Sequence, residues 1–247
     1  MVHQTMTKMA ASTNKRQKMR LAISGGGPAG LTLAGILSRE GNSEAFDITV
    51  FERNTINSDQ GSGWDIIKDA QDSLTRAGLN VASIQRKESD TFRFYKVQDE
   101  KHPVYCMRMP SLLSRFGIQK DQIGMDEANL ETDRTKLVNG LTASLGPNVT
   151  VNYESYISGA RCNEEEDSIE LLGHNGSSLG EFDLIVDASG ARSPLRNIRF
   201  SPKADAFYTG TTIIQYLVNS PEKSWDKDIV DRLGEGSLAL YGKIVIE

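Results

Sequence analysis

The chain has 247 residues and a mass of 27.2 kDa, which is enough for one or two domains. Its hydrophobic, charged and aromatic fractions of 38%, 25% and 7% are those of a globular protein and exclude a fibre or a wholly disordered chain. A net charge of -5 argues against a nucleic acid partner, and no apolar run approaches the length of a membrane span. We therefore expect a cytoplasmic protein that binds neither nucleic acid nor membrane.

The first motif follows a basic, acid-free stretch, residues 1–20, which we expect to be a flexible tail. The apolar run 21–24 then enters GGGPAG (residues 25–30), which fits G-x-G-x-x-G and predicts a strand that turns into a helix. The helix should continue to residue 39 and stop at Gly41. Alternating apolar residues over 46–51 predict a second strand, so residues 21–52 should form a βαβ unit.

This pattern is typical of dinucleotide binding, since each glycine has a physical role. Gly25 makes the tight turn, Gly27 lets the backbone approach a pyrophosphate, and Gly30 lets the helix pack on the strand. The helix that begins at Pro28-Ala29 offers its N-terminal amides to an anion. Glu52 follows about 20 residues later, where a carboxylate binds ribose hydroxyls and repels a 2′-phosphate. The sequence therefore predicts FAD or NAD here rather than NADP.

Further elements follow along the chain. Asp65 should cap a helix over 66–77 that ends at Gly78, and residues 91–97 and 103–109 should pair as an antiparallel hairpin. A helix over 132–145 carries Arg134 in its apolar stripe, which requires either a cofactor anion or an internal acid as partner. Trp64 is either a packed surface tryptophan or part of a cofactor or substrate cavity.

The last third of the chain predicts strands and a second glycine turn. Residues 149–153 form a predicted strand, and a hairpin follows with turns at 164–167 and 175–176. A buried strand over 182–186 should run into the turn that starts at Asp187, and residues 211–218 and 238–246 are strand-like. Cys106 and Cys162 should be free thiols, and no residue spacing predicts a metal site.

Four sequence runs resemble a known family. LAISGGGPAGLTLAGILSREG and ITVFER resemble the FAD fingerprint of the class A flavoprotein monooxygenases, the family of para-hydroxybenzoate hydroxylase. GSGWDIIKDAQDSLTRAGL and DRTKLVNGL look most like the tetracycline-inactivating branch. The resemblance implies an α/β fold with a Rossmann-like FAD-binding domain in residues 21–90 and 112–199. Residues 91–111 and 200–247 would then form part of an antiparallel substrate-binding sheet.

The resemblance also implies roles for individual residues. Glu52 would bind the adenosine ribose, Arg53 would lie beside the adenosine, Asp65 would lie on the flavin side and Arg134 would contact FAD. The complete set of implied cofactor-binding residues is Gly25, Gly27, Pro28, Ala29, Gly30, Glu52, Arg53, Asp65, Arg134, Asp187 and Gly190. Ser189 stands where the family has an aspartate, and the family's third motif, a Gly-Asp turn at the flavin ribityl chain, is absent from the sequence.

The implied activity is that of the cofactor. NAD(P)H would reduce FAD, and a flavin hydroperoxide formed with dioxygen would oxygenate an aromatic or polyketide-like small molecule, in secondary metabolism. No catalytic side chain is predicted, because in such enzymes the protein supplies binding and orientation. Two alternatives stay open at this point: a truncated FAD-binding fragment without activity, and an NAD-dependent dehydrogenase built on the same βαβ unit.

Overall fold

The structure, a computed structural model of the chain, divides into two compact units. The first unit comprises Met1–Ser58, Arg76–Gly78 and Leu141–Asp205, and the second comprises Asp59–Thr75, Leu79–Gly140 and Ala206–Glu247. The residues that the structure describes are 18–39, 43–56, 58, 63–84, 91–96, 105–108, 130–164, 167–199, 206–212, 218, 220–233 and 237–241.

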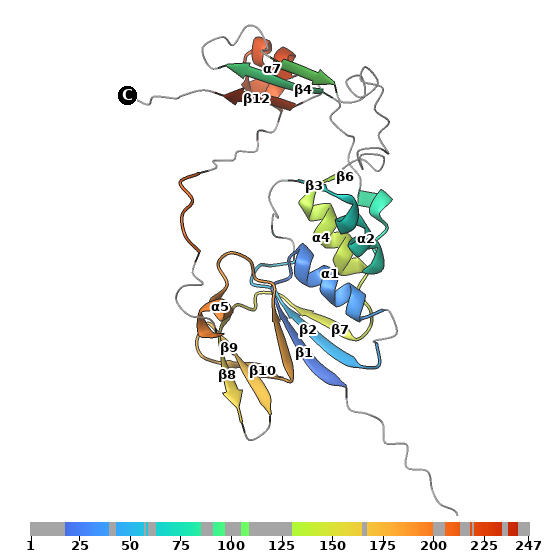
Figure 1. Cartoon of the computed structure of the whole chain (residues 1–247), viewed down its shortest axis with the longest axis vertical. Helices are drawn as coiled ribbons and strands as arrows, with labels where there is room; N and C mark the ends of the chain where they lie inside the picture. The colour runs from blue at the N-terminus through green and yellow to red at the C-terminus, as the bar shows by residue number, and fades with distance from the viewer. Residues whose placement is uncertain are drawn as a thin grey trace, which may run out of the picture. The chain divides into compact units, whose positions relative to one another are not determined.

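A four-stranded parallel sheet forms the centre of the first unit, with strand order β11-β1-β2-β7 (Figure 1). Its strands are β1 (Met19–Ser24), β2 (Phe46–Phe51), β7 (Val149–Asn152) and β11 (Leu184–Asp187). Helix α1 (Pro28–Leu37) connects the parallel pair β1 and β2, which confirms the predicted βαβ unit. Along this pair Ile23 lies beside Val50, and both side chains are fully buried.

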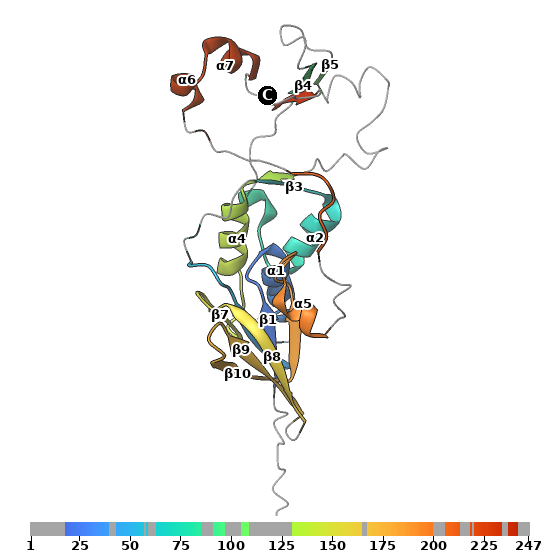
Figure 2. The same cartoon turned by 90° about the vertical axis from the view of Figure 1, so that its left-hand side faces the viewer.

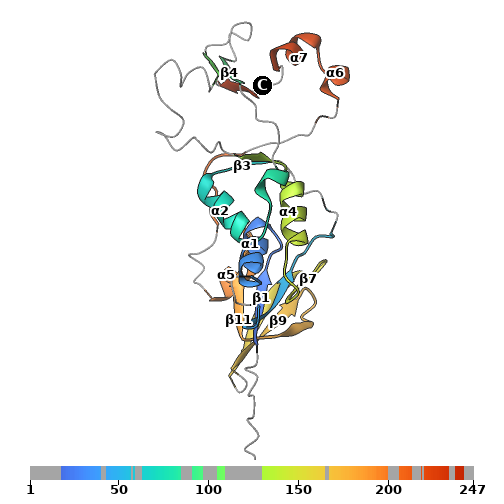
Figure 3. The same ribbon diagram turned by 90° about the vertical axis from the view of Figure 1, so that its right-hand side faces the viewer.

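Helix α1 and a second sheet cover opposite faces of the parallel sheet (Figures 2 and 3). The second sheet is antiparallel and consists of β8 (Ile157–Asn163), β9 (Ser168–Gly173) and β10 (Ser178–Phe182). The short helix α5 (Pro194–Arg199) packs against β8. The predicted hairpin is therefore confirmed and extends to three strands. Its turns contain Asp167 and Gly176 with positive φ, as turn residues often have.

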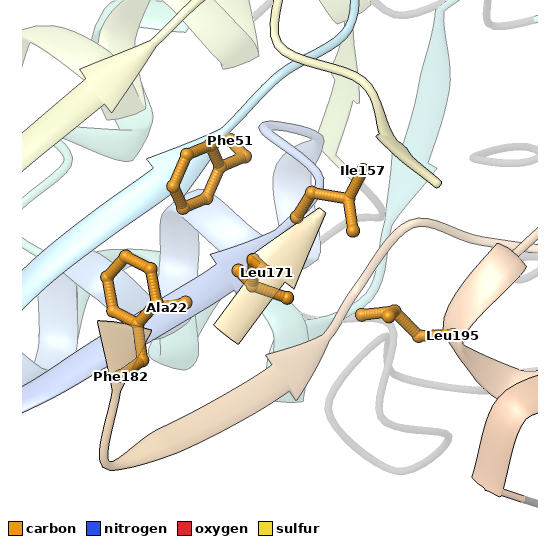
Figure 4. Close-up of a cluster of buried hydrophobic side chains, with 6 residues drawn as sticks. All are labelled: Ala22, Phe51, Ile157, Leu171, Phe182 and Leu195. Carbon is orange, nitrogen blue, oxygen red and sulfur yellow. The ribbon is translucent and has the colours of Figure 1, made fainter. Parts of the chain in front are cut away.

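One apolar cluster joins the two sheets (Figure 4). Its aromatic pair, Phe51 from β2 and Phe182 from β10, is perpendicular with ring centroids 5.7 Å apart. Such edge-to-face pairs stabilise beyond the area they bury. The full cluster is Ala22, Phe51, Ile157, Leu171, Phe182 and Leu195. This packing fixes the parallel strands whose ends carry the predicted site.

Two predicted boundaries in the first unit are wrong. Helix α1 ends at Leu37 and not at the predicted residue 39, and its C-cap Ser38 keeps right-handed angles, φ -76° and ψ -8°. Gly41, the predicted stop, lies outside the described residues. The hydroxyl of Ser38 donates to the Gly35 carbonyl and accepts the Gly146 amide, which satisfies groups at the helix end. The single buried strand over 182–186 is broken at Asp183, and Leu184 is 44% exposed.

The second unit begins with a strand pair that the sequence did not predict. Strand β3 (Trp64–Ile66) pairs antiparallel with β6 (Leu130–Thr132), so Asp65 lies in a strand and is not a helix cap. Helix α2 starts later, at Lys68–Arg76, and the 3₁₀ helix η1 spans Val81–Ile84. The predicted end at Gly78 is confirmed: its φ is +90°, and the next amide, that of Leu79, bonds back to Leu74 over 3.0 Å.

Helix α4 (Arg134–Ala143) starts two residues later than predicted, because Thr132 belongs to β6. Its cap is Asp133, whose Oδ1 accepts the amides of Thr135 and Lys136 at 2.8 and 3.2 Å. The stripe that the sequence predicted on this helix is buried, with Leu137 only 1% exposed.

The predicted hairpin over 91–109 is confirmed by the antiparallel pair β4 (Thr91–Lys96) and β5 (Tyr105–Arg108). Strand β12 (Ser237–Tyr241) joins β4 in parallel, and helices α6 (Pro221–Ser224) and α7 (Lys227–Leu233) precede it. Most of the predicted strand 211–218 lies outside the described residues. Among those described, no helix is both long and apolar enough to cross a membrane.

Candidate functional site

The glycine loop begins where β1 ends. Gly25 has φ +107°, in the left-handed region, and its amide donates to the Phe51 carbonyl over 2.8 Å. A Cβ at Gly25 would lie 2.6 Å from the carbonyl oxygen of Ala188, in the turn that follows β11. Both the angle and the contact therefore require glycine, as the motif predicted. The loop is held between the ends of its two neighbouring strands.

Gly27 and the start of α1 leave an open space. Gly27 is the N-cap of α1, and no atom lies within 4 Å of the position that its Cβ would occupy. Pro28 takes the first helical position, and no side chain caps the helix. An uncapped helix start presents unpaired N–H groups and a positive dipole end. Exposed Ala29 lies in this first turn. The start of α1 can therefore bind an anion such as a phosphate.

Unlike Gly27, Gly30 is buried and has no open space at its Cβ position. Its Cβ would lie only 2.1 Å from the Gly25 carbonyl oxygen and 3.2 Å from a methyl group of Ile23. The helix thus lies directly on the strand and loop, which is the packing role that the third glycine of the motif predicts.

Glu52 follows β2 and is fixed against the glycine loop. One carboxylate oxygen accepts the Gly26 amide and the other accepts the Asn54 amide, each over 2.9 Å. A carboxylate oxygen has more than one acceptor site, so both remain able to bind ribose hydroxyls. Gly26 occupies a variable position of the motif, and sequence reasoning gave it no role. Its Cβ would lie 2.9 Å from that of Glu52. Arg53, the next residue, is exposed.

The turn after β11 forms its own hydrogen-bond network. The Asp187 carboxylate accepts the amide of Ser189 over 3.1 Å and the hydroxyls of Ser189 and Ser193. Ser193 in turn accepts the Arg196 amide over 3.0 Å and so caps α5. Sequence reasoning gave Ser193 no role, although a serine before Pro-Leu-Arg is a helix-start signal. Gly190 has φ +85° and open space around its Cβ position.

These three segments of the first unit follow the carboxyl ends of three adjacent strands, β1, β2 and β11. Ligands of open α/β sheets bind at this edge. Gly25–Gly30, Glu52 and Asp187–Gly190 thus share one unit and one sheet edge. Asp65 and Arg134 belong to the second unit.

Arg134 is the first residue of α4, and its guanidinium lies over the indole ring of Trp64. Its guanidinium carbon lies 5.0 Å from the centroid of the indole ring, which is a cation–π contact. The Nε atom is buried and has no hydrogen-bond partner among the described residues. Within that part of the chain, no internal acid pairs with Arg134, which was one of the two possibilities that the sequence left open.

The residues of the first unit fit the adenosine diphosphate half of FAD. Gly27 leaves open space beside the loop, the uncapped start of α1 supplies amides for an anion, and Glu52 supplies an oriented carboxylate. The fold and this edge of the sheet are those of an α/β protein with a Rossmann-like parallel sheet.

Comparisons with known proteins agree with this class. No family model matches the chain. A monooxygenase of Emericella nidulans, asqM, is 28% identical over 241 residues, which cover 92% of this chain and 50% of that protein. The tetracycline destructase Tet(51) matches in structure with a TM-score of 0.53 at 18% identity, over 75% of this chain and 42% of that one.

A further structural match was solved with FAD bound. A Klebsiella pneumoniae HpxO variant, solved in complex with FAD, has a TM-score of 0.50 and 18% identity over 72% of this chain and 41% of that one. At such identities the likeness shows the fold, which is an α/β fold with a parallel sheet and a separate antiparallel sheet, as the sequence predicted. The chain spans about half the length of the curated relative that it matches.

Proposed function

We propose that the chain binds FAD and forms the nucleotide-binding part of an FAD-dependent monooxygenase of the para-hydroxybenzoate hydroxylase type, nearest the tetracycline-inactivating branch. The observation that carries the proposal is the Glu52 carboxylate, held on the Gly26 amide beside the open space at Gly27. The resemblance of the sequence and the names of the matched proteins support it.

The residues at the cofactor-binding edge of the first unit have proposed tasks. The amides at the start of α1, around Pro28 and Ala29, bind the diphosphate, while Gly27 keeps a side chain out of its way. Glu52 binds the adenosine ribose, and the exposed Arg53 lies beside the adenosine. The turn Asp187–Gly190 contributes backbone groups, with Asp187 fixing its conformation.

Two residues of the second unit have proposed tasks as well. Arg134 contributes a guanidinium to an anionic group of FAD, and its Nε, which has no hydrogen-bond partner among the described residues, supports that role. Asp65 contributes to the flavin side.

When bound, FAD supplies the redox chemistry by which NAD(P)H and dioxygen oxygenate an aromatic or polycyclic small molecule. The chain's own residues bind and orient the cofactor. No side chain of the described residues is assigned a catalytic role. We propose the cytoplasm as the location and secondary metabolism as the setting.

The test is flavin binding by the whole chain. The purified protein should carry flavin, or bind added FAD with quenching of flavin fluorescence, and ADP should compete. Glu52→Gln should weaken FAD affinity by about tenfold or more, because a neutral amide replaces a charged acceptor. Its NH₂ group would also face the backbone amide of either Gly26 or Asn54, which is a donor as well. Glu44→Gln is the matched control in the same unit, since that side chain is 84% exposed. A chain that binds no flavin refutes the proposal.

Turnover distinguishes the remaining alternatives. FAD-dependent oxidation of NAD(P)H with uptake of dioxygen supports the monooxygenase. Flavin binding without NAD(P)H oxidation supports the FAD-binding chain that lacks activity. Binding of NAD without FAD supports the dehydrogenase, which shares the βαβ unit.

A further inference from the structure

Trp64 and Arg134 come from elements that the fold fixes side by side in the second unit. Trp64 is the first residue of β3 and lies opposite Thr132 in the pairing of β3 with β6. The hydroxyl of fully buried Thr132 donates to the Ile84 carbonyl over 2.8 Å, which fixes β6 against η1. Asp133 then caps α4, so the backbone at Arg134 is fixed between β6 and α4.

Among the described residues, the partner of this arginine is an aromatic face rather than an acid. A guanidinium stays charged at any physiological pH, and a partly buried charge is costly unless it is paired. The indole face attracts the cation but accepts no hydrogen bond in the plane of the guanidinium. The buried Nε of Arg134 has no partner among the described residues. Within the described part of the chain, the Nε–H donor is therefore left for an anionic ligand.

We propose that Trp64 is a positioning residue: its indole holds the Arg134 guanidinium in place, so that the N–H donors of the arginine bind an anionic group of the cofactor. The inference rests on the proposed function for the identity of that anion. Its geometric basis is the distance of 5.0 Å between the guanidinium carbon and the indole centroid, and the lack of a hydrogen bond at Nε among the described residues. Stacking on an aromatic face also restricts the arginine rotamers, which lowers the entropy lost on binding.

The first experiment measures FAD affinity in three tryptophan variants of the whole chain. Trp64→Phe keeps an aromatic face and should bind FAD within about twofold of the unmodified chain. Trp64→Leu removes the face and should weaken binding about three- to tenfold, the range for a partly exposed cation–π contact. Trp225→Leu is the matched control, because Trp225 is also 41% exposed, and it should leave FAD affinity unchanged. Equal losses in the phenylalanine and leucine variants at position 64 would overturn the inference.

The second experiment is a double-mutant cycle with Arg134→Met. If Trp64 acts through Arg134, then Trp64→Leu should weaken FAD binding by less than about twofold when Arg134 is already methionine. A merely structural tryptophan would weaken binding equally in both backgrounds, and that result would contradict the proposal. Thermal unfolding of all four proteins shows that the titrations compare folded chains.

A third measurement separates this inference from the proposed function. The chain contains two tryptophans, so in Trp225→Phe all tryptophan emission comes from Trp64. Inorganic pyrophosphate should change this emission, because it binds the stacked guanidinium, and the change should vanish when Arg134→Met is added. Pyrophosphate sensitivity without any flavin binding refutes the proposed function but supports the inference. Flavin binding with no change in Trp64 emission and no effect of Trp64→Leu overturns the inference alone.

Discussion

Gly27→Ala should separate cofactor binding from folding. Gly27 has φ -77°, an angle that alanine adopts freely, and no atom lies within 4 Å of the added Cβ. The free energy of unfolding should therefore change by no more than about 0.5 kcal/mol. The new methyl group would occupy the space that the proposed diphosphate approaches. Losing one charge-assisted hydrogen bond costs about 1.5–3 kcal/mol, so FAD should bind about 10- to 100-fold more weakly.

Gly30→Ala is the matched contrast, because the same methyl group would lie 2.1 Å from the Gly25 carbonyl oxygen. Helix α1 must move by about 1 Å to relieve this contact, and overpacking of this kind costs about 1–3 kcal/mol. The midpoint of thermal unfolding should fall by several degrees, at about 2–4 °C for each kcal/mol in a domain of this size. Position 27 should thus affect binding and position 30 should affect stability.

Thermal unfolding and flavin fluorescence titration measure both quantities on the same samples. Normal FAD affinity in the position-27 variant would refute the placement of the diphosphate at the start of α1. A large loss of stability in that variant would show that the space beside Gly27 is filled in the folded chain.

Three further predictions concern stability. Hydrogen bonds from the side chain and backbone of Arg20, assisted by its charge, hold the pKa of Asp183 below its ordinary value of 3.8. Because the side chain is exposed, the Asp183 carboxylate should stabilise the fold by at most about 1 kcal/mol. This stabilisation should be present above pH 4 and be lost as the pH falls below the pKa of the folded state. Asp183→Asn should therefore unfold at a lower temperature than the unmodified chain only at the higher pH. Thr132→Val leaves the Ile84 carbonyl unpaired and should cost about 1–3 kcal/mol in urea unfolding, whereas an unchanged midpoint would mean that water replaces the hydroxyl. Leu171→Ala opens a cavity in the apolar cluster, where Leu171 is fully buried, and should cost about 2–5 kcal/mol by the same measurement; a loss below about 1 kcal/mol would show that the two sheets repack.

The cofactor-binding edge was largely predictable, because its signals are local in sequence. The glycine spacing predicted the loop at Gly25–Gly30, and the alternation over 46–51 predicted the strand that ends at Glu52. The hydrogen bond between Glu52 and Gly26 was not predictable, since it depends on the register of β1 against β2. The network around Asp187 likewise depends on the fold of the turn, which brings the Ser193 hydroxyl back to the carboxylate.

By itself the sequence determined the α/β class, the βαβ unit, the hairpins and the buried stripe of α4. These features were predictable because the spacing of apolar residues follows the period of a helix or a strand, and that spacing is visible within one segment of the sequence. Only the tertiary structure decided which distant segments pair. It placed β11 beside β1, and it paired Trp64–Ile66 with Leu130–Thr132, so that Asp65 lies in a strand and Trp64 meets Arg134. Such pairings depend on burial and on closing long loops, so no local pattern records them.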